Sequence, residues 1–386
     1  MTDRTEFLIE TARMSTKLDD LGDDSYLPGL EQLVASMDAE AQLHEFGALT
    51  LDGLMIGHMM NRLRITDWLR DHGEVLANPL ERPVFIVGLP RTGTTLLSYL
   101  LDQDPAMRSL MSWEALESVP PPQLETFTSD KRITQVRDGK NFFNVLNPDF
   151  RVIHHEEADG PTECLTVLAQ DFKSIFWETM ANVPSYSAWL RSADHRSAYL
   201  YHRSVLQVLQ SGVPGRWVLK SPAHRLDLDV LLEVYPDALF IDTYRDPLTV
   251  VTSMCSLVSS LSGTFSKADH NDYIARHWTE LVSRMADLVD DARRRDPDLD
   301  ARFIDIDYDD LVSAPVEVGR RIYDHIGAAW SSDVERAMTR YVDSNPAGAR
   351  GPHSYTPEGL GIDRDEIELR FAGYKERRGL GSPRPT

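Results

Sequence analysis

The sequence predicts an α/β fold of three layers, in which helices cover both faces of a central parallel sheet. Four short apolar runs, each bounded by turn or charged residues, are typical of strands buried on both faces of such a sheet. Helical patterns separate the runs, and strands that alternate with helices indicate an α/β architecture. The four runs are residues 84–87, 217–219, 238–241 and 303–306.

The helical patterns divide the chain into two expected parts. Residues 1–78 are predicted to be an N-terminal helical addition, since residues 45–69 carry a long apolar pattern of helical period. Residues 79–386 are expected to form the domain that contains the sheet. Its clearest helix spans 273–295, where the apolar side chains make one stripe. Residues 118–150, with three consecutive prolines, are predicted to form a loop or lid.

Composition narrows the classes of partner and compartment. The 386 residues include 61 acidic and 40 basic ones, and the formal charge of −21 opposes a nucleic-acid partner. Only Cys164 and Cys255 are present, so a reducing, cytoplasmic compartment is expected. The first residues lack the apolar core of a signal peptide, and no segment approaches the roughly 20 apolar residues of a membrane span. We therefore expect a soluble protein.

A glycine-containing loop follows the first predicted strand. Residues 88–95 have glycines at the first and sixth positions, between a buried strand and good helix sequence, which is the spacing of a P-loop. Such a loop turns backbone N–H groups and a helix N-terminus toward an anion. Thr94 stands where a nucleotide triphosphatase carries its lysine, so the loop suits a phosphosulfate better than a triphosphate. The expected contacts are Arg91, Thr92, Gly93, Thr94 and Thr95.

Arg245 and Ser253 form a second candidate anion site. Arg245 follows the third predicted strand and Ser253 lies two helical turns later, so guanidinium and hydroxyl can converge on one anion. Together with residues 88–97, this pair resembles the sulfotransferase family that uses 3′-phosphoadenosine 5′-phosphosulfate (PAPS). Residues 303–315 are similar to the family's late strand and the helix after it. The resemblance covers roughly residues 80–330.

The resemblance implies an enzyme that transfers a sulfuryl group from PAPS to an acceptor hydroxyl by in-line attack and releases adenosine 3′,5′-bisphosphate. The loop would hold the 5′-phosphosulfate, and Arg245 with Ser253 the 3′-phosphate. Sulfuryl transfer needs no metal, and the acidic and histidine residues match no familiar zinc spacing, so no metal is expected. A tail segment resembles one that closes over the nucleotide in bacterial relatives, and its expected contacts are Arg350, His353 and Tyr355.

The acceptor hydroxyl must lose its proton, so a general base is required. Glu114 is the first candidate, because tyrosylprotein and heparan sulfotransferases use a glutamate shortly after the loop helix. The alternatives are His154 and His155, which lie beside two glutamates, and the sequence leaves the choice open.

Lys220 is expected to support catalysis. It resembles a strand-end lysine found across the family, and with Arg91 it would stabilise the negative charge of the transition state. In animal cytosolic members a catalytic histidine follows that lysine by two positions, and Pro222 occupies the place in this chain. That departure favours a base other than such a histidine.

Two other functions fit parts of the sequence. A P-loop kinase or ATPase would use Asp242 as a magnesium ligand, but Thr94 argues against it. A nucleotide-binding protein without activity would keep the loop and lose the base. The acceptor class is open among small molecules, lipids and glycans, and so is the oligomeric state.

Overall fold

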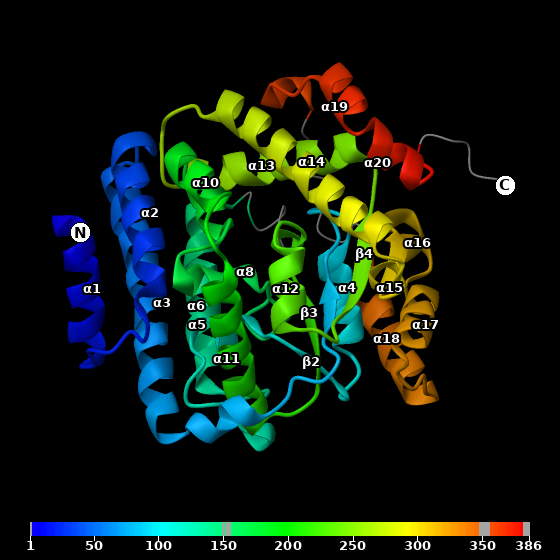
Figure 1. Cartoon of the computed structure of the whole chain (residues 1–386), viewed down its shortest axis with the longest axis horizontal. Coiled ribbons are helices and arrows are strands. Elements are labelled where there is room, and N and C mark those ends of the chain that lie inside the picture. The colour runs from blue at the N-terminus through cyan, green and yellow to red at the C-terminus, as the bar shows by residue number, and fades with distance from the viewer. Residues whose placement is uncertain (1, 149, 151–155, 347–355, 381–386) are drawn as a thin grey trace.

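The centre of the computed structural model is a five-stranded parallel sheet, and the structure describes residues 2–148, 150, 156–346 and 356–380. The strands are β1 (Val84–Ile86), β2 (Met107–Ser109), β3 (Arg216–Lys220), β4 (Leu239–Tyr244) and β5 (Phe303–Asp307). They lie in the order β2-β3-β1-β4-β5, so β1 is central. Val84 pairs in parallel with Val218 on one side and Leu239 on the other. The predicted α/β class with a central parallel sheet is confirmed (Figure 1).

Helices cover both faces of the sheet. Successive side chains of β1 point to opposite faces, and both sets are buried. Phe85 and Val87 belong to one apolar cluster, whereas Val84 and Ile86 belong to another. The helices that pack in the first cluster include α8 (Leu165–Leu168), α11 (Arg196–Gly212), α12 (Leu228–Val234) and α15 (Pro297–Asp300). Those in the second are α4 (Thr94–Leu101), α16 (Tyr308–Ser313), α17 (Pro315–Ile326) and α18 (Ser332–Ser344).

A third apolar cluster joins the N-terminal helices to the rest of the chain. The N-terminal helices are α1 (Asp3–Thr16), α2 (Leu27–Glu40) and α3 (Glu45–Asp71), which stand side by side in Figure 1. Their buried side chains belong to the same apolar cluster as those of six later helices. These helices are α9 (Phe176–Met180), α10 (Pro184–Leu190), α13 (Pro247–Gly263), α14 (Asn271–Arg295), α19 (Arg364–Arg370) and α20 (Ala372–Arg377). The helical character predicted for the N-terminal region is confirmed, and its core is continuous with that of the following helices.

Two features of the region after the loop differ from the sequence-based expectations. Residues 118–150 are not a loop or lid throughout, since they contain the helix α6 (Lys131–Leu146), which follows the short helix α5 (Ser112–Leu116). Strand β2 was not predicted, because Arg108 at its centre interrupts the apolar pattern. The two differences have different reasons: β2 is buried although its central residue is charged, whereas α6 is a largely exposed helix with only Arg132 and Ile133 buried.

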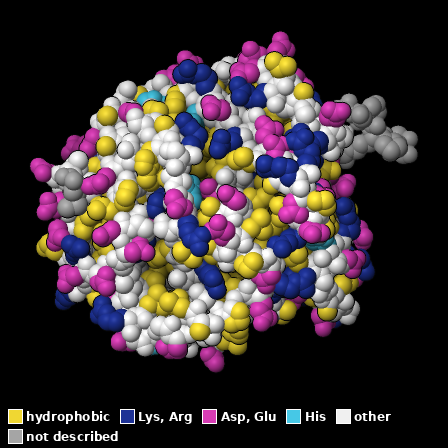
Figure 2. Space-filling model, in the orientation of Figure 1, with side chains coloured by type: hydrophobic (Ala, Val, Ile, Leu, Met, Phe, Trp, Pro, Cys, Tyr) yellow, Lys and Arg dark blue, Asp and Glu magenta, His cyan; other side chains and the backbone are white. Residues whose placement is uncertain are grey.

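Figure 2 shows one face of the molecule and the distribution of charged side chains on it. Lys and Arg side chains are interspersed there with Asp and Glu, and no continuous basic surface is formed. Among the helices of the described residues, none combines the length and the apolar character needed to cross a bilayer.

Candidate active site

The glycine-containing loop connects β1 to α4 and is anchored on β4. A Cβ atom at Gly88 would lie 1.8 Å from Thr243 Oγ1 and 2.7 Å from the Thr243 carbonyl oxygen, so only glycine fits. The hydroxyls of Thr92 and Thr243 are hydrogen-bonded at 2.6 Å. Gly93, with φ of 87°, is the N-cap of α4. The loop therefore presents the N-terminus of α4 at the carboxyl edge of the sheet, where anions bind.

The predicted 3′-phosphate pair lies beside this loop. Asp246 caps α13 by accepting a hydrogen bond from the Thr249 backbone N–H at 2.9 Å, which fixes the turn between Arg245 and the helix that carries Ser253. Arg91 Nε donates to Ser253 Oγ at 3.0 Å, and Arg245 Nη1 donates to the Arg91 carbonyl oxygen at 3.4 Å. The structure thus brings Arg91, Arg245 and Ser253 together, with Arg91 turned toward the pair.

An aromatic ring orients the second arginine. The guanidinium carbon of Arg245 lies 3.9 Å from the centroid of the Tyr308 ring, at the start of α16. Asp307 caps that helix through the Asp309 backbone N–H at 2.7 Å. A cation stacked on a ring keeps its N–H edge free to point at an anion. The segment that resembles the family's late strand therefore supports the anion site.

Lys220 lies at the end of β3 and is buried, with 2% of its surface exposed. Its Nζ is 3.4 Å from Thr95 Oγ1 in the loop and 3.6 Å from Glu163 Oε1. The Cys164 backbone N–H donates to the Lys220 carbonyl oxygen at 2.9 Å, which holds the Glu163 segment against β3. Lys220 therefore lies between the glycine-containing loop and the carboxylate of Glu163, which was not among the predicted site residues.

Glu163 is that carboxylate. Its side chain keeps 17% of its surface exposed, so an incoming molecule can reach it. Glu163 stands in a Gly-Pro-Thr-Glu segment that shows neither helical nor strand period, and its proximity to Lys220 depends on pairing between distant parts of the chain. No local signal in the sequence marks it. A partly exposed carboxylate beside a buried lysine and an anion-binding loop is placed as a general base requires.

Glu114 occupies a different environment from the one predicted. Its side chain is fully buried, and both of its oxygens bind the guanidinium of Arg108, one of them at 2.9 Å. The Met111 backbone N–H donates to the same carboxylate at 3.1 Å. A base must touch the acceptor hydroxyl, and this carboxylate has no exposed oxygen with which to do so. The structure therefore opposes the expectation that Glu114 is the base and makes it the partner of Arg108.

Several predicted site residues lie outside the described residues. They are His154, His155, Arg350, His353 and Tyr355, so their expected roles stay predictions. Glu156, next to the histidine pair, accepts hydrogen bonds from Lys140 at 2.6 Å and from Thr162 at 2.9 Å. Among the described residues, no group of three or more His, Cys, Asp or Glu side chains is arranged to hold a metal ion.

The histidine that follows Lys220 is not available as a base. His224 is fully buried and its Nδ1 is hydrogen-bonded to the Tyr199 hydroxyl at 2.8 Å. The neighbouring His202 bonds through Nδ1 to the Tyr235 hydroxyl at 2.7 Å. Burial lowers the pKa of His202 to about 3 and holds that of His224 well below its usual value. Both imidazoles are neutral, and both are fully buried in the interior of the protein.

Asp242 is not available for the magnesium-binding role that it would have in a kinase or ATPase. Its carboxylate lies 2.5 Å from Arg225 Nη1, 2.7 Å from Arg378 Nη2 and 3.5 Å from Arg293 Nη1. The side chain is 1% exposed. A carboxylate neutralised by three guanidinium groups cannot serve as a magnesium ligand, because cations already occupy its oxygens. Asp242 is a structural residue.

Comparisons with known proteins agree with this geometry. A model of the sulfotransferase family matches residues 83–332. The crystal structure of sulfotransferase STF9 from Mycobacterium avium superposes with a TM-score of 0.89 at 32% identity, over 96% of each chain. That of sulfotransferase STF1 from Mycobacterium tuberculosis H37Rv gives a TM-score of 0.85 at 32% identity, over 97% of this chain and 99% of the other.

A curated relative agrees over a shorter stretch. Omega-hydroxy-beta-dihydromenaquinone-9 sulfotransferase Stf3 of Mycobacterium tuberculosis (strain CDC 1551 / Oshkosh) is 29% identical over 273 residues, which are 66% of this chain. The match spans 64% of the length of that relative, and the same figures hold for the protein of Mycobacterium bovis. The family match and the two superpositions establish that the chain belongs to the sulfotransferase family, whose general reaction is the PAPS-dependent transfer of a sulfuryl group.

Proposed function

We propose that the chain transfers a sulfuryl group from PAPS to the hydroxyl of an apolar, lipid-class acceptor in the cytoplasm. The observation that carries the proposal is the convergence of Arg91, Arg245 and Ser253 on the loop that begins α4, with Lys220 Nζ 3.4 Å from Thr95. The relative named for omega-hydroxy-beta-dihydromenaquinone-9 supports the lipid class. Residues 79–386 would form the catalytic domain and residues 1–78 its helical addition.

The donor would be held at two points. We assign the 5′-phosphosulfate to the backbone of residues 92–95 and to Lys220, since the N-terminus of α4 and a buried cation meet there. We assign the 3′-phosphate to Arg245 and Ser253. Arg91 is included in this site because its Nε donates a hydrogen bond to Ser253 Oγ.

The proposed reaction has three parts: one bond forms, one bond breaks and one proton is transferred. The acceptor oxygen forms a bond to sulfur while the bond from sulfur to the 5′-phosphate oxygen breaks, and the acceptor proton moves to a base. We assign the base to Glu163, since its carboxylate is partly exposed and 3.6 Å from Lys220 Nζ. Lys220 would neutralise the charge that gathers on the departing phosphate. Glu163 with Lys220 favours an enzyme over a nucleotide-binding protein without activity.

The base assignment is tested with Glu163→Gln. General-base contributions run to roughly 100- to 10,000-fold, so turnover should fall by that factor while the affinity for adenosine 3′,5′-bisphosphate is unchanged. The control is Glu117→Gln. The Glu117 carboxylate lies 3.2 Å from Arg64 Nη1. Sulfur-labelled PAPS incubated with lipid extracts supplies the turnover assay. Near-normal turnover in Glu163→Gln would reject this base.

The donor site is tested by calorimetry with adenosine 3′,5′-bisphosphate. Arg245→Ala should weaken binding at least tenfold, because a charge-assisted hydrogen bond contributes about 1.5–3 kcal/mol. Ser253→Ala should weaken it less, and ATP with magnesium should bind the native chain poorly. The control Arg336→Ala removes an exposed arginine of α18. Unchanged affinity in Arg245→Ala would contradict the assignment of the 3′-phosphate.

A further inference from the structure

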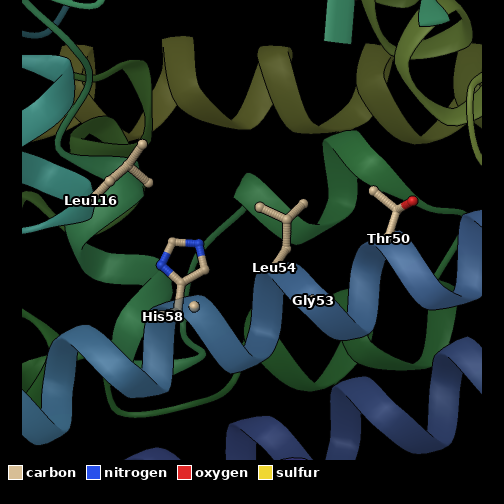
Figure 3. A pocket seen from close by; sticks show the side chains of 6 residues that line it. Thr50, Gly53, Leu54, His58 and Leu116 are labelled. Atoms are coloured by element: carbon tan, nitrogen blue, oxygen red, sulfur yellow. The ribbon is translucent and has the colours of Figure 1, made fainter. Parts of the chain in front are cut away.

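A cavity of about 340 Å³ lies beside α3, near the end of α5 (Figure 3). That volume is in the range of small-molecule sites. Among the described residues that line it, the polar side chains are Thr50, whose hydroxyl already donates to the Phe46 carbonyl oxygen at 2.7 Å, and His58. In Figure 3 the His58 ring stands between Leu54 and Leu116. The lining residues are Thr50, Gly53, Leu54, Gly57, His58 and Leu116.

The open space of the cavity lies over two glycines of α3. Gly53 and Gly57 are one helical turn apart, and a Cβ atom at either position would meet nothing within 4 Å. Glycine in the interior of a helix is unfavourable, because it gives up more backbone freedom than other residues. No close neighbour requires either glycine here. What the two glycines do is keep this strip of α3 free of side chains.

His58 is the unpaired polar group of the cavity. It is 3% exposed, and its Nε2 has no hydrogen-bond partner among the described residues. The ring packs edge-on against Phe176 and Trp177, at 5.5 and 5.3 Å between centroids. Burial lowers the pKa of His58 to about 4, so the imidazole is neutral at pH 7 and offers one donor and one acceptor. A buried polar atom without a partner favours a ligand that supplies one.

The surface beside the cavity is apolar as well. Leu49, one turn before Gly53 on α3, is 65% exposed, and Phe46 is 45% exposed. Leu116, in the cavity wall, is 40% exposed. Apolar side chains that stay in water at the rim of an apolar cavity are typical of a binding site for an apolar molecule.

A short segment connects this cavity to the proposed base. Phe176, against His58, begins α9, and α9 packs on α13, the helix that carries Ser253. Ser174 Oγ donates to the Leu165 carbonyl oxygen at 2.9 Å, and Leu165 follows Glu163 by two residues. The segment 163–176 therefore has the proposed base at one end and, at the other, Phe176 in contact with the ring of His58, a residue that lines the cavity.

We infer that the cavity holds the far end of the acceptor, an elongated apolar molecule with a hydroxyl at its reacting end and a hydrogen-bonding oxygen at its other end. The apolar chain lies over Gly53 and Gly57, and the second oxygen pairs with the His58 imidazole. The inference rests on the proposed function for the reacting hydroxyl. It names the acceptor by its chemistry: one apolar chain between two oxygens.

The test is calorimetric titration of the full chain with decane-1,10-diol and decan-1-ol. Gly57→Leu fills the cavity from a helix position where leucine is a better helix former, so the fold is retained. We expect it to weaken diol binding at least tenfold. The matched control is Gly139→Leu, an exposed glycine of α6 with nothing within 4 Å of a Cβ atom, and it should bind as the native chain does.

His58→Phe separates the polar contact from ring packing. It keeps an aromatic ring against Phe176 and removes both nitrogens, so affinity for the diol should fall at least fivefold while affinity for decan-1-ol is retained. Native-like diol binding in Gly57→Leu, equal loss of both probes in His58→Phe, or no binding of the diol to the native chain would each overturn the inference. Adenosine 3′,5′-bisphosphate, titrated in parallel, should bind all variants equally. Its failure to bind the native chain would reject the donor proposal and leave the cavity result valid.

Discussion

At the scale of single residues, Arg108 accounts both for a strand that was not predicted and for the burial of Glu114, the first candidate for the base. It is the middle residue of β2 and is 3% exposed. Its guanidinium lies 4.7 Å from the Trp217 ring and 4.8 Å from the Phe127 ring, and Glu114 supplies the counter-charge. A buried arginine is tolerated only when it is fully paired in this way. The same carboxylate cannot also be offered to a substrate.

Glu114→Gln should therefore act on stability. Removing one partner of a buried ion pair costs about 3–5 kcal/mol, so the free energy of unfolding in urea should fall by that amount. Glu117→Gln, with the half-buried partner Arg64, should cost less than about 1 kcal/mol. A Glu114→Gln protein of native stability that has lost turnover would restore Glu114 as the base.

At the scale of elements, the sequence predicted those parts of the site that lie within one strand-loop-helix unit. The loop at 88–95 and the Arg245–Ser253 pair each follow a buried strand directly, so their spacing fixes their geometry. Glu163 could not be predicted in this way, because its position depends on the hydrogen bond from Cys164 to Lys220, between segments far apart in the chain. Helix α6 was missed because its sequence is polar, and contacts such as that of Asn147 with the Ser260 carbonyl oxygen hold its end.

Gly88→Ala tests how tightly the loop is fitted to β4. The added methyl would meet the Thr243 backbone as well as its side chain, so the backbone of the loop or of β4 would have to shift. Overpacking of this kind costs about 1–3 kcal/mol or more. We expect a lower free energy of unfolding and a loss of adenosine 3′,5′-bisphosphate affinity. Gly139→Ala, in the open, should instead stabilise by about 0.5–1 kcal/mol. A Gly88→Ala protein with native stability and native affinity would contradict the tight fit.

At the scale of the whole molecule, three buried histidines couple the fold to pH. Burial lowers the pKa of His58 to about 4 and of His202 to about 3, and that of His224 lies well below its usual value of 6.5. Below pH 6.5 these histidines therefore bind protons in the unfolded chain but stay neutral in the folded chain, until the pH approaches their lowered pKa values. Stability is complete above pH 6.5 and is lost as the pH falls toward the folded-state pKa values.

The free energy of unfolding should therefore decrease between pH 6.5 and pH 5, with a slope that approaches about 1.4 kcal/mol per pH unit for each histidine. This window lies above the range in which most carboxylates titrate. Urea unfolding at several pH values measures the slope, and His58→Phe should reduce it by the share of one histidine. A slope that is the same in His58→Phe and in the native chain would contradict the contribution of His58.

The contact of Arg378 with Asp242 has a consequence for how the chain folds during its synthesis. Arg378, just after α20, also reaches Asp290 at 3.0 Å, and in Figure 1 α20 lies beside the upper end of β4. Until the ribosome has released residue 378, two buried carboxylates lack this counter-charge. A nascent chain folds its early segments first, but the central sheet can reach its final stability only after residue 378 has left the ribosome. The segment after α20 must therefore be in place before the ion pairs of Asp242 and Asp290 with Arg378 can form.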